Sequence, residues 1–330
     1  MRTDNNRVLR FVLWALILAF GVSAEAQQRG KVYRIGYISN APGIREGTEE
    51  IFVQALQELG YKDGIDTVIE WRFSQGKVDR LPSLAKELVR AKVDCIVTLG
   101  IAPTRAAKQA TADIPIVIGN ADDDPVRQGL VHSLARPGGN VTGIISIASD
   151  LAGKRLEILK ETIPLLSQVA VLWDPSGPGG AGHIHESEAI APALKLEIQR
   201  AEIRGPKDLD KAFQAMVKAR IQGLVVVTTA SINSHRAKIV SLAANTRLPA
   251  IYTNPSFVRA GGLMSYADDR AARMHRVAEF VDKIFKGAKP ADLPVERPIK
   301  FELIINLKAA KQIGLTIPPN VLVRATEVIR

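Results

Sequence analysis

Cysteine is nearly absent from this chain, since Cys95 is its one thiol among 330 residues. A single cysteine excludes an internal disulfide, a cysteine metal cluster and a dithiol redox pair. Cys95 stands in an apolar run, which predicts a small buried side chain. A chain of this length can build a core without disulfides, so their absence is compatible with an exported protein.

The sequence also lacks the short motifs of several catalytic classes. G-x-S-x-G, the Walker A pattern and H-E-x-x-H are all missing. The formal net charge is +10, but Lys and Arg are scattered among Asp and Glu rather than clustered. We therefore expect neither an enzyme nor a nucleic-acid-binding protein.

Long apolar runs are rare too, and the clearest one is Phe11–Val22 near the N-terminus. Three arginines precede it and Ala24-Glu25-Ala26 follows, which is the arrangement of a secretory signal peptide. The run is shorter than the roughly 20 residues of a membrane span, although an uncleaved anchor remains the alternative. We predict a signal peptide at residues 1–26 and a periplasmic location.

Apolar runs and helix-like segments alternate through the rest of the chain. This pattern predicts parallel sheets covered by helices on both faces. Two sets of strands fit two doubly wound lobes better than one very wide sheet. The expected strands are 32–39, 67–71, 96–99, 114–118, 141–147, 169–173, 196–201, 223–227, 250–252, 263–266 and 301–305. The expected helices include 48–59, 82–89, 151–163, 186–194, 209–220, 236–245, 269–286 and 308–313.

Polar side chains gather where these strands end. Ligands of open α/β sheets bind beyond the carboxyl ends of the strands, so we expect a ligand cleft there. Hydroxyls and amides suit a small polar molecule, and helix N-termini suit its anionic group. A turn or helix cap is the alternative for each residue. The candidates are Ser39, Asn40, Pro103, Thr104, Asn120, Ser146, Trp173, Thr228, Thr229, Asn254 and Tyr266.

Three further motifs have competing interpretations. Asp122-Asp123-Asp124 could bind a cation or a substrate amine, or could cap a helix that begins at Pro125. Gly177-Pro-Gly-Gly-Ala-Gly182 matches G-x-G-x-x-G, but Pro178 removes a backbone N–H that a pyrophosphate would need. We expect a flexible loop there. His183-Ile-His185-Glu186 could ligate a metal, but no second cluster accompanies it, so we expect an exposed loop and helix start.

Several segments in combination resemble one known family. The chain is similar to the periplasmic substrate-binding proteins of ABC transporters, which have the type I periplasmic-binding-protein fold, and within them to the tryptophan/tyrosine-type branch. The resemblance covers essentially the whole chain after the predicted signal peptide. It is carried by Arg34-Ile-Gly-Tyr, Asp124-Pro-Val, Gly129-Leu-Val, Ser133-Leu-Ala-Arg-Pro-Gly-Gly-Asn-Val-Thr-Gly143, the segment 281–296, Phe301-Glu-Leu-Ile-Ile-Asn-Leu-Lys-Ala-Ala310 and Gly314-Leu-Thr-Ile-Pro-Pro319.

The resemblance implies two lobes, three crossovers and ligand capture by hinge closure. One lobe would comprise 31–146 plus 268–290, and the other 147–267 plus 291–330. The matching ligand-binding positions would be Asn40, the turn 101–104 with Pro103 and Thr104, Asp124, Ser146, Trp173, Asp174, Thr229, Asn254 and the segment Tyr266–Asp268. The chain departs from the family at Ile101-Ala102, where a Thr-Pro pair is common, and in its acidic run, so the ligand cannot be carried over.

The sequence thus predicts the solute-binding component of an ABC importer, without cofactor or metal. The expected ligand is amino-acid-like: helix N-termini would hold its carboxylate, and Asp122–Asp124 or Asp268 its amine. The expected partners are a permease and an ATPase, and the protein is expected to be a monomer. The alternatives are a ligand sensor that docks to a membrane receptor and a two-lobed α/β transferase.

Overall fold

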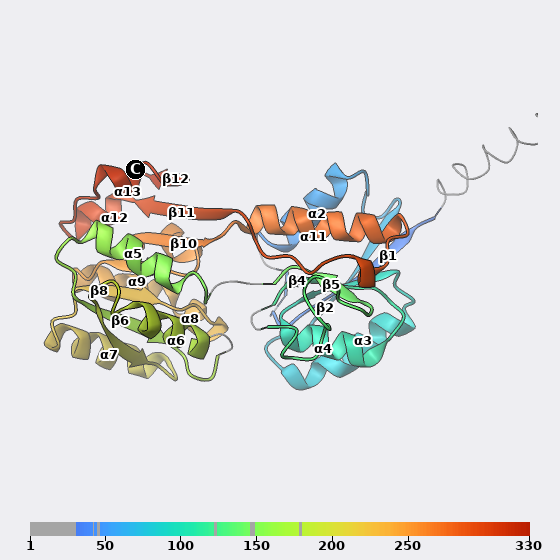
Figure 1. The fold of residues 1–330 in the computed structure, drawn as a ribbon, viewed down its shortest axis with the longest axis horizontal. Helices are drawn as coiled ribbons and strands as arrows, with labels where there is room; N and C mark the ends of the chain where they lie inside the picture. The colour runs from blue at the N-terminus through green and yellow to red at the C-terminus, as the bar shows by residue number, and fades with distance from the viewer. Residues whose placement is uncertain (1–30, 42, 45–46, 122–123, 146–148, 178–179) are drawn as a thin grey trace, which may run out of the picture.

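The computed structural model describes residues 31–330 except 42, 45–46, 122–123, 146–148 and 178–179. It contains two α/β lobes that lie side by side along the long axis of the molecule (Figure 1). One sheet has five strands and the other seven. The predicted fold class, two doubly wound lobes, is confirmed. The predicted signal peptide and Ser146 lie outside the described residues.

The first sheet has the strand order β2-β1-β3-β4-β5, and all its pairings are parallel. Helices α3 and α4 cover one face with buried residues such as Leu88 and Ala107. Helices α2 and α11 cover the other, with Phe52 and Val281. The bounds are β1 Tyr33–Ser39, α2 Glu49–Glu58, β2 Thr67–Phe73, α3 Leu81–Arg90, β3 Cys95–Leu99, α4 Ile101–Ala110, β4 Ile116–Asn120, β5 Val141–Gly143 and α11 Arg270–Phe285.

The second sheet has the order β12-β11-β10-β9-β8-β6-β7, and β10 and β11 form its antiparallel pair. Residues of α5, α6, α12 and α13 pack on one face, and residues of α7, α8, α9 and α10 on the other. The strands are β6 Gln168–Trp173, β7 Glu197–Glu202, β8 Gly223–Val226, β9 Ala250–Tyr252, β10 Met264–Asp268, β11 Phe301–Asn306 and β12 Glu327–Ile329. The helices are α5 Ala152–Thr162, α6 Gly180–Ile190, α7 Pro206–Lys218, α8 Ala230–Ser234, α9 Arg236–Asn245, α10 Ser256–Arg259, α12 Leu307–Gln312 and α13 Pro319–Leu322.

Three local predictions differ from the structure. The helix expected at 186–194 is α6, which begins at Gly180 and ends at Ile190. The helix expected to begin at Pro125 is replaced by turns, in which the N–H of Leu130 donates to the carbonyl of Pro125 at 2.8 Å. The sequence prediction had no strand near the C-terminus, where the short β12 pairs with β11.

The chain crosses between the lobes three times. It leaves the first lobe after β5, returns from β10 into α11, and leaves again before β11 (Figure 1). Because β10 runs toward the first lobe and β11 returns from it, these two neighbours are antiparallel. The predicted lobe boundaries, between 146 and 147, 267 and 268, and 290 and 291, remain a prediction.

Backbone hydrogen bonds tie the crossovers to one another. The N–H of Ile145 donates to Glu296 at 3.0 Å, and the N–H of Glu296 donates to Gly143 at 2.8 Å. The N–H of Asp269 donates to the carbonyl of Lys300 at 2.9 Å. The side chain of Glu296 also accepts two hydrogen bonds from Arg276 of α11, at 2.8 and 2.6 Å. These bonds hold the three crossover segments together.

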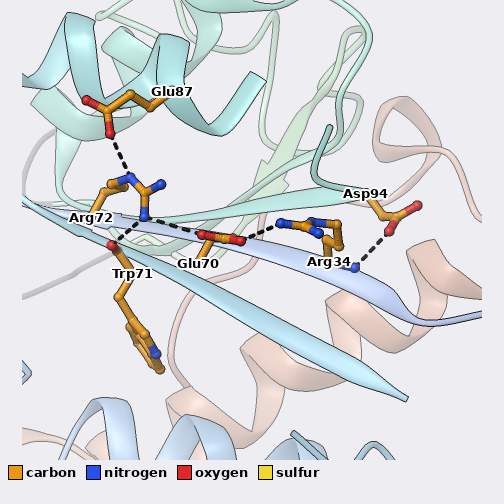
Figure 2. A network of polar contacts seen from close by, with 6 residues as sticks. All are labelled: Arg34, Glu70, Trp71, Arg72, Glu87 and Asp94. Atoms are coloured by element: carbon orange, nitrogen blue, oxygen red, sulfur yellow. Dashed lines mark hydrogen bonds and ion pairs between the residues drawn. The ribbon is translucent and has the colours of Figure 1, made fainter. Parts of the chain in front are cut away.

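The edge of the first sheet carries a network of charged side chains, shown in Figure 2. Arg72 donates to Glu87 at 2.9 Å and to the carbonyl of Trp71 at 2.9 Å. Glu70 lies between Arg72 and Arg34 and pairs with both. The Trp71 indole points away from these charges and contacts the rings of Tyr37 and Phe73. The charged face of the edge strand is therefore solvated while its other face is apolar.

Candidate functional site

The chain path fixes which sheet edges face each other. β5 leads out of the first lobe at its carboxyl end, and β10 leads out of the second lobe at its own. Strands β1 to β4 lie parallel to β5, and β9, β8 and β6 lie parallel to β10. The carboxyl ends of both sheets therefore point toward the opposite lobe, which is where ligands of such sheets bind.

On the first lobe, Asn120 offers an unused polar atom at this edge. It is the last residue of β4, and its carbonyl accepts the N–H of Gly100 at 2.7 Å. Its side-chain Oδ1 is buried and has no hydrogen-bond partner among the described residues. Buried polar atoms in proteins are nearly always paired, so this acceptor is a candidate for a bound ligand.

The neighbouring turn at the start of α4 is already satisfied internally. Thr104 is fully buried, and its hydroxyl donates to the carbonyl of Gly100 at 2.8 Å and lies 2.7 Å from the Thr98 hydroxyl. Pro103 is buried in the same turn, beneath Gly100 with its φ of 106°. A Cβ at residue 100 would touch the Pro103 ring at 3.5 Å. In this structure both predicted residues support the helix start.

Asn40 and Asp124 also have local partners. The Oδ1 of Asn40 accepts a hydrogen bond from the Ser74 hydroxyl, which joins the ends of β1 and β2. Asp124 accepts the N–H of Val126 at 2.8 Å and lies 3.9 Å from Arg127. Asp124 therefore stabilises the turn at Pro125, where the structure forms no helix for it to cap. Asp122 and Asp123 lie outside the described residues.

On the second lobe, Trp173 and Thr228 carry unused polar atoms. Trp173 ends β6 and is 8% exposed, and its Nε1 is buried without a partner among the described residues. The hydroxyl of Thr228, just after β8, is likewise buried and unpaired there. Its backbone N–H donates to the Thr253 hydroxyl at 2.8 Å, so the ends of β8 and β9 are joined.

Three other residues of this edge serve local turns. Asp174 accepts the N–H and the hydroxyl of Ser176, at 2.9 and 2.5 Å. Thr229 caps α8 by accepting the N–H of Ile232 at 3.2 Å. Asn254 accepts the N–H of Ser256 at 2.9 Å. These hydrogen bonds stabilise the loops that follow β6, β8 and β9.

Asp268 lies at the second crossover and forms an ion pair with Arg273 in the first turn of α11. Both side chains are largely buried, with 16% and 10% exposure. Burial lowers the pKa of Arg273 to about 10, which still leaves the guanidinium charged at neutral pH. The pair links the end of β10 to the first lobe.

Tyr266 lies in a different place from the other predicted residues. Its ring is 6.0 Å from the ring of Phe301, centroid to centroid. Together they line a groove of about 300 Å³. The remaining lining residues are Lys154, Ile158, Leu303 and Arg324. Of the predicted ligand-binding residues that the structure describes, Tyr266 alone lines this groove.

Two expectations about the segment 177–186 need correction. A flexible loop was expected at Gly177–Gly182, but α6 already begins at Gly180. An exposed loop and helix start were expected at His183; it does lie in the first turn of α6, but it is buried, with 2% exposure. Its Nε2 is 2.8 Å from Nη1 of Arg155, which is itself 1% exposed. Burial, and then the charge of Arg155, lower the pKa of His183 to about 3. The ring is therefore neutral and hydrogen-bonded to Arg155.

The described residues contain no group of three or more His, Cys, Asp or Glu arranged to hold a metal. Within this same part of the chain, no helix is both long enough and apolar enough to cross a bilayer. Sequence reasoning missed Arg155. The spacing along α5 could have indicated its burial. Arg155 lies three residues after Ala152 and four before Leu159, so it falls in the apolar stripe of the helix.

Known proteins share this architecture. A solved structure from Vibrio cholerae, titled a conserved domain protein, aligns with a TM-score of 0.78 at 24% identity, over 90% of this chain and all of that one. A Streptococcus pneumoniae ABC domain in complex with L-Trp aligns with a TM-score of 0.77 at 26% identity, over 90% of this chain and 99% of that one. A tyrosine-binding protein of Clostridioides difficile is 28% identical over 264 residues, which cover 80% of this chain and 75% of the relative.

The family model for ABC transporter substrate binding proteins matches residues 40–329. This match spans both lobes and all three crossovers. It confirms the resemblance predicted from the sequence. The chain belongs to the family of ABC transporter substrate-binding proteins.

Proposed function

We propose that the protein is the extracytoplasmic solute-binding component of an ABC importer and captures an amino acid between its lobes. The family assignment and the facing carboxyl ends support this function. A ligand that contacts both lobes only when they approach would shift the equilibrium toward a closed form by its differential affinity. The transporter would then recognise that form.

The observation that carries the proposal is a set of buried polar atoms, on both lobes, that have no hydrogen-bond partner among the described residues. Asn120 Oδ1 is an acceptor on the first lobe, and Trp173 Nε1 is a donor on the second. Thr228 Oγ1, also on the second lobe, can act as either. A ligand that satisfies all three must offer both a donor and an acceptor, as the ammonium and carboxylate of an amino acid do.

The relatives favour an aromatic side chain on this ligand. One relative is named a tyrosine-binding protein and one solved neighbour holds L-Trp. The apolar faces of Trp173 and of the buried strand ends suit such a ring. We therefore propose L-tryptophan or L-tyrosine as the first ligands to test.

The experiment is a thermal-shift and calorimetric screen of the purified protein against the twenty amino acids. A ligand at 100 times its dissociation constant should stabilise the fold by about 2.7 kcal/mol. Asn120→Ala and Trp173→Phe should each weaken binding by roughly 1–3 kcal/mol, because a ligand group loses its partner. Asn245→Ala, on the exposed side of α9, is the matched control and should bind like the parent. If no amino acid binds, or if both site variants bind unchanged, the proposal is wrong.

The position of the ligand amine is a separate step of the proposal. Asp268 or Asp124 would hold it, although each carboxylate has a partner in this structure. If Asp124→Ala and Asp268→Ala both leave the affinity unchanged, the amine is held elsewhere. Calorimetry with the same ligand tests the position of the amine. A negative result would leave the proposed solute-binding function standing.

The importer role carries further expectations. The protein would be exported by residues 1–26, act as a monomer without turnover of its ligand, and deliver the ligand to a permease driven by an ATPase. Deletion of residues 1–26 should keep the protein in the cytoplasm, which fractionation of periplasm and cytoplasm would reveal.

A further inference from the structure

Arg155 is a charged residue in an interior position of the second lobe. It lies in the first turn of α5 and is 1% exposed, and burial lowers its pKa to about 9. Removing a guanidinium from water is costly unless its geometry is well satisfied. A methionine or leucine would fill this apolar stripe without that cost. The guanidinium at this position therefore calls for a specific explanation.

Its hydrogen bonds connect separate parts of the lobe. Nε of Arg155 donates to the carbonyl of Tyr266 at 2.8 Å, two residues before Asp268 ends β10. Helix α5 itself begins directly after the first crossover. One side chain thus joins the chain segments that follow the first crossover and precede the second.

A second hydrogen bond of Arg155 runs to α6 and defines the protonation state of His183. Since Arg155 Nη1 can only donate, Nε2 of His183 accepts at 2.8 Å and the proton resides on Nδ1. Nδ1 lies 3.4 Å from the Ser187 hydroxyl, which donates to the carbonyl of His183 at 2.8 Å. The network continues into the backbone of α6 and fixes the imidazole in one tautomer.

Helix α6 packs closely against α5 and against Trp173 at the end of β6. A Cβ at Gly153 of α5 would come within 2.4 Å of the Ile190 side chain of α6. At its other end, a Cβ at Gly180 would lie 3.0 Å from the Trp173 ring. In the preceding loop, a Cβ at Gly177 would lie 2.3 Å from the Thr229 methyl group. The glycines permit these close contacts, so a displacement of α6 would press on the Trp173 ring.

We propose that Arg155 and His183 are positioning residues that couple the hinge to the ligand-binding wall, defined here as Trp173, Gly177, Gly180 and Thr229. The inference rests on the proposed function, because the wall is where the ligand would bind. Arg155 holds α6 in register with the crossovers, and α6 holds the Trp173 indole at the interlobe edge. Ligand contact with Trp173 and rotation about the hinge are therefore linked through one buried network.

The test uses fluorotryptophan incorporated into the full chain, read by fluorine NMR. The chain has three tryptophans, Trp14, Trp71 and Trp173. Arg155→Met should shift or broaden the Trp173 signal and leave the Trp71 signal, in the other lobe, in place. In calorimetry with L-tryptophan and L-tyrosine, Arg155→Met and His183→Leu should each raise the dissociation constant by about tenfold.

Two variants separate positioning from general destabilisation. His183→Gln retains a side-chain acceptor for Arg155 and should restore the parental Trp173 signal and affinity. Leu159→Ala removes a fully buried side chain from the same helix. It should lower the melting temperature while leaving the Trp173 signal unmoved and the dissociation constant within about twofold of the parent. Arg155→Lys serves as the second arginine variant if Arg155→Met does not fold.

The coupling is overturned if folded Arg155 and His183→Leu variants show the parental Trp173 signal. It is also overturned if Leu159→Ala shifts that signal as much as they do. If the parent binds neither L-tryptophan nor L-tyrosine, the aromatic-ligand step of the proposed function has failed. The ligand-free fluorine spectra still decide the coupling in that case.

Discussion

Two arginine networks, one in each lobe, differ in their exposure to water. In the first lobe, Arg34 and Arg72 pair with carboxylates on a solvated strand face, where the side chains are 23–47% exposed (Figure 2). In the second lobe, Arg155 is buried and bonds to a carbonyl oxygen and a neutral imidazole. Water can replace a lost partner in the first network but not in the second. The two networks should therefore differ sharply in their sensitivity to mutation.

The largest effect is expected for Arg155→Met. It leaves the Tyr266 carbonyl and His183 Nε2 without their donor, and each unpaired buried group costs about 1–3 kcal/mol. We expect the free energy of unfolding to fall by about 2–5 kcal/mol in urea titration. Arg72→Met in the exposed network is the matched control and should cost about 1 kcal/mol or less. Equal losses for the two variants would remove the distinction between the networks.

The next effect concerns the pH dependence of stability. His183 has a pKa of about 3 in the folded protein and about 6.5 when unfolded. Between these values the unfolded chain binds more protons, so stability that is complete above pH 6.5 is lost as the pH falls. The loss between pH 7 and pH 5 should be about 2 kcal/mol. In urea titrations at pH 5, 6 and 7, His183→Gln should lose less stability than the parent as the pH falls. If parent and variant lose the same amount, other groups cause the pH dependence.

The fold and part of the candidate site could be predicted from the sequence. Runs such as Val169–Trp173 are apolar at every position, so they indicate buried parallel strands, and the two-lobed fold follows from their alternation with helices. Trp173 and Asn120 could be predicted as ligand-binding candidates because the ends of strands can be located from the sequence. Their free polar atoms, however, depend on tertiary contacts.

Arg155 and His183 show where this reasoning stops. Arginine in an amphipathic helix is normally read as solvent-facing, and glycines near a helix are read as breakers. Here Gly180 is the first residue of α6, and its missing side chain leaves room for the Trp173 ring. Pro125 was expected to start a helix, but the chain forms only turns there. In each case a long-range contact or a short local turn overrode the pattern.

A moderate effect is expected for Glu296→Gln at the third crossover. This carboxylate accepts two hydrogen bonds from Arg276, which hold its pKa below the usual value despite partial burial. The pair is about one-third exposed, so its loss should cost about 1 kcal/mol and less at high salt. Because the pKa is lowered, this stability is present above the unfolded pKa and lost as the pH falls through the folded one. Urea titration at pH 7 and pH 3.5 should show a larger difference between parent and variant at the higher pH.

The smallest effect is expected for Glu70→Gln in the network of Figure 2. Glu70 lies between Arg34 and Arg72, so its removal leaves two arginines facing each other, but both remain hydrated. We expect a loss of about 0.5 kcal/mol at low salt, which disappears in about 1 M salt as the charges are screened. The Trp173 fluorine signal, in the other lobe, should not move. A loss as large as that of Arg155→Met would mean that the edge network, in spite of its exposure, is as indispensable as the buried one.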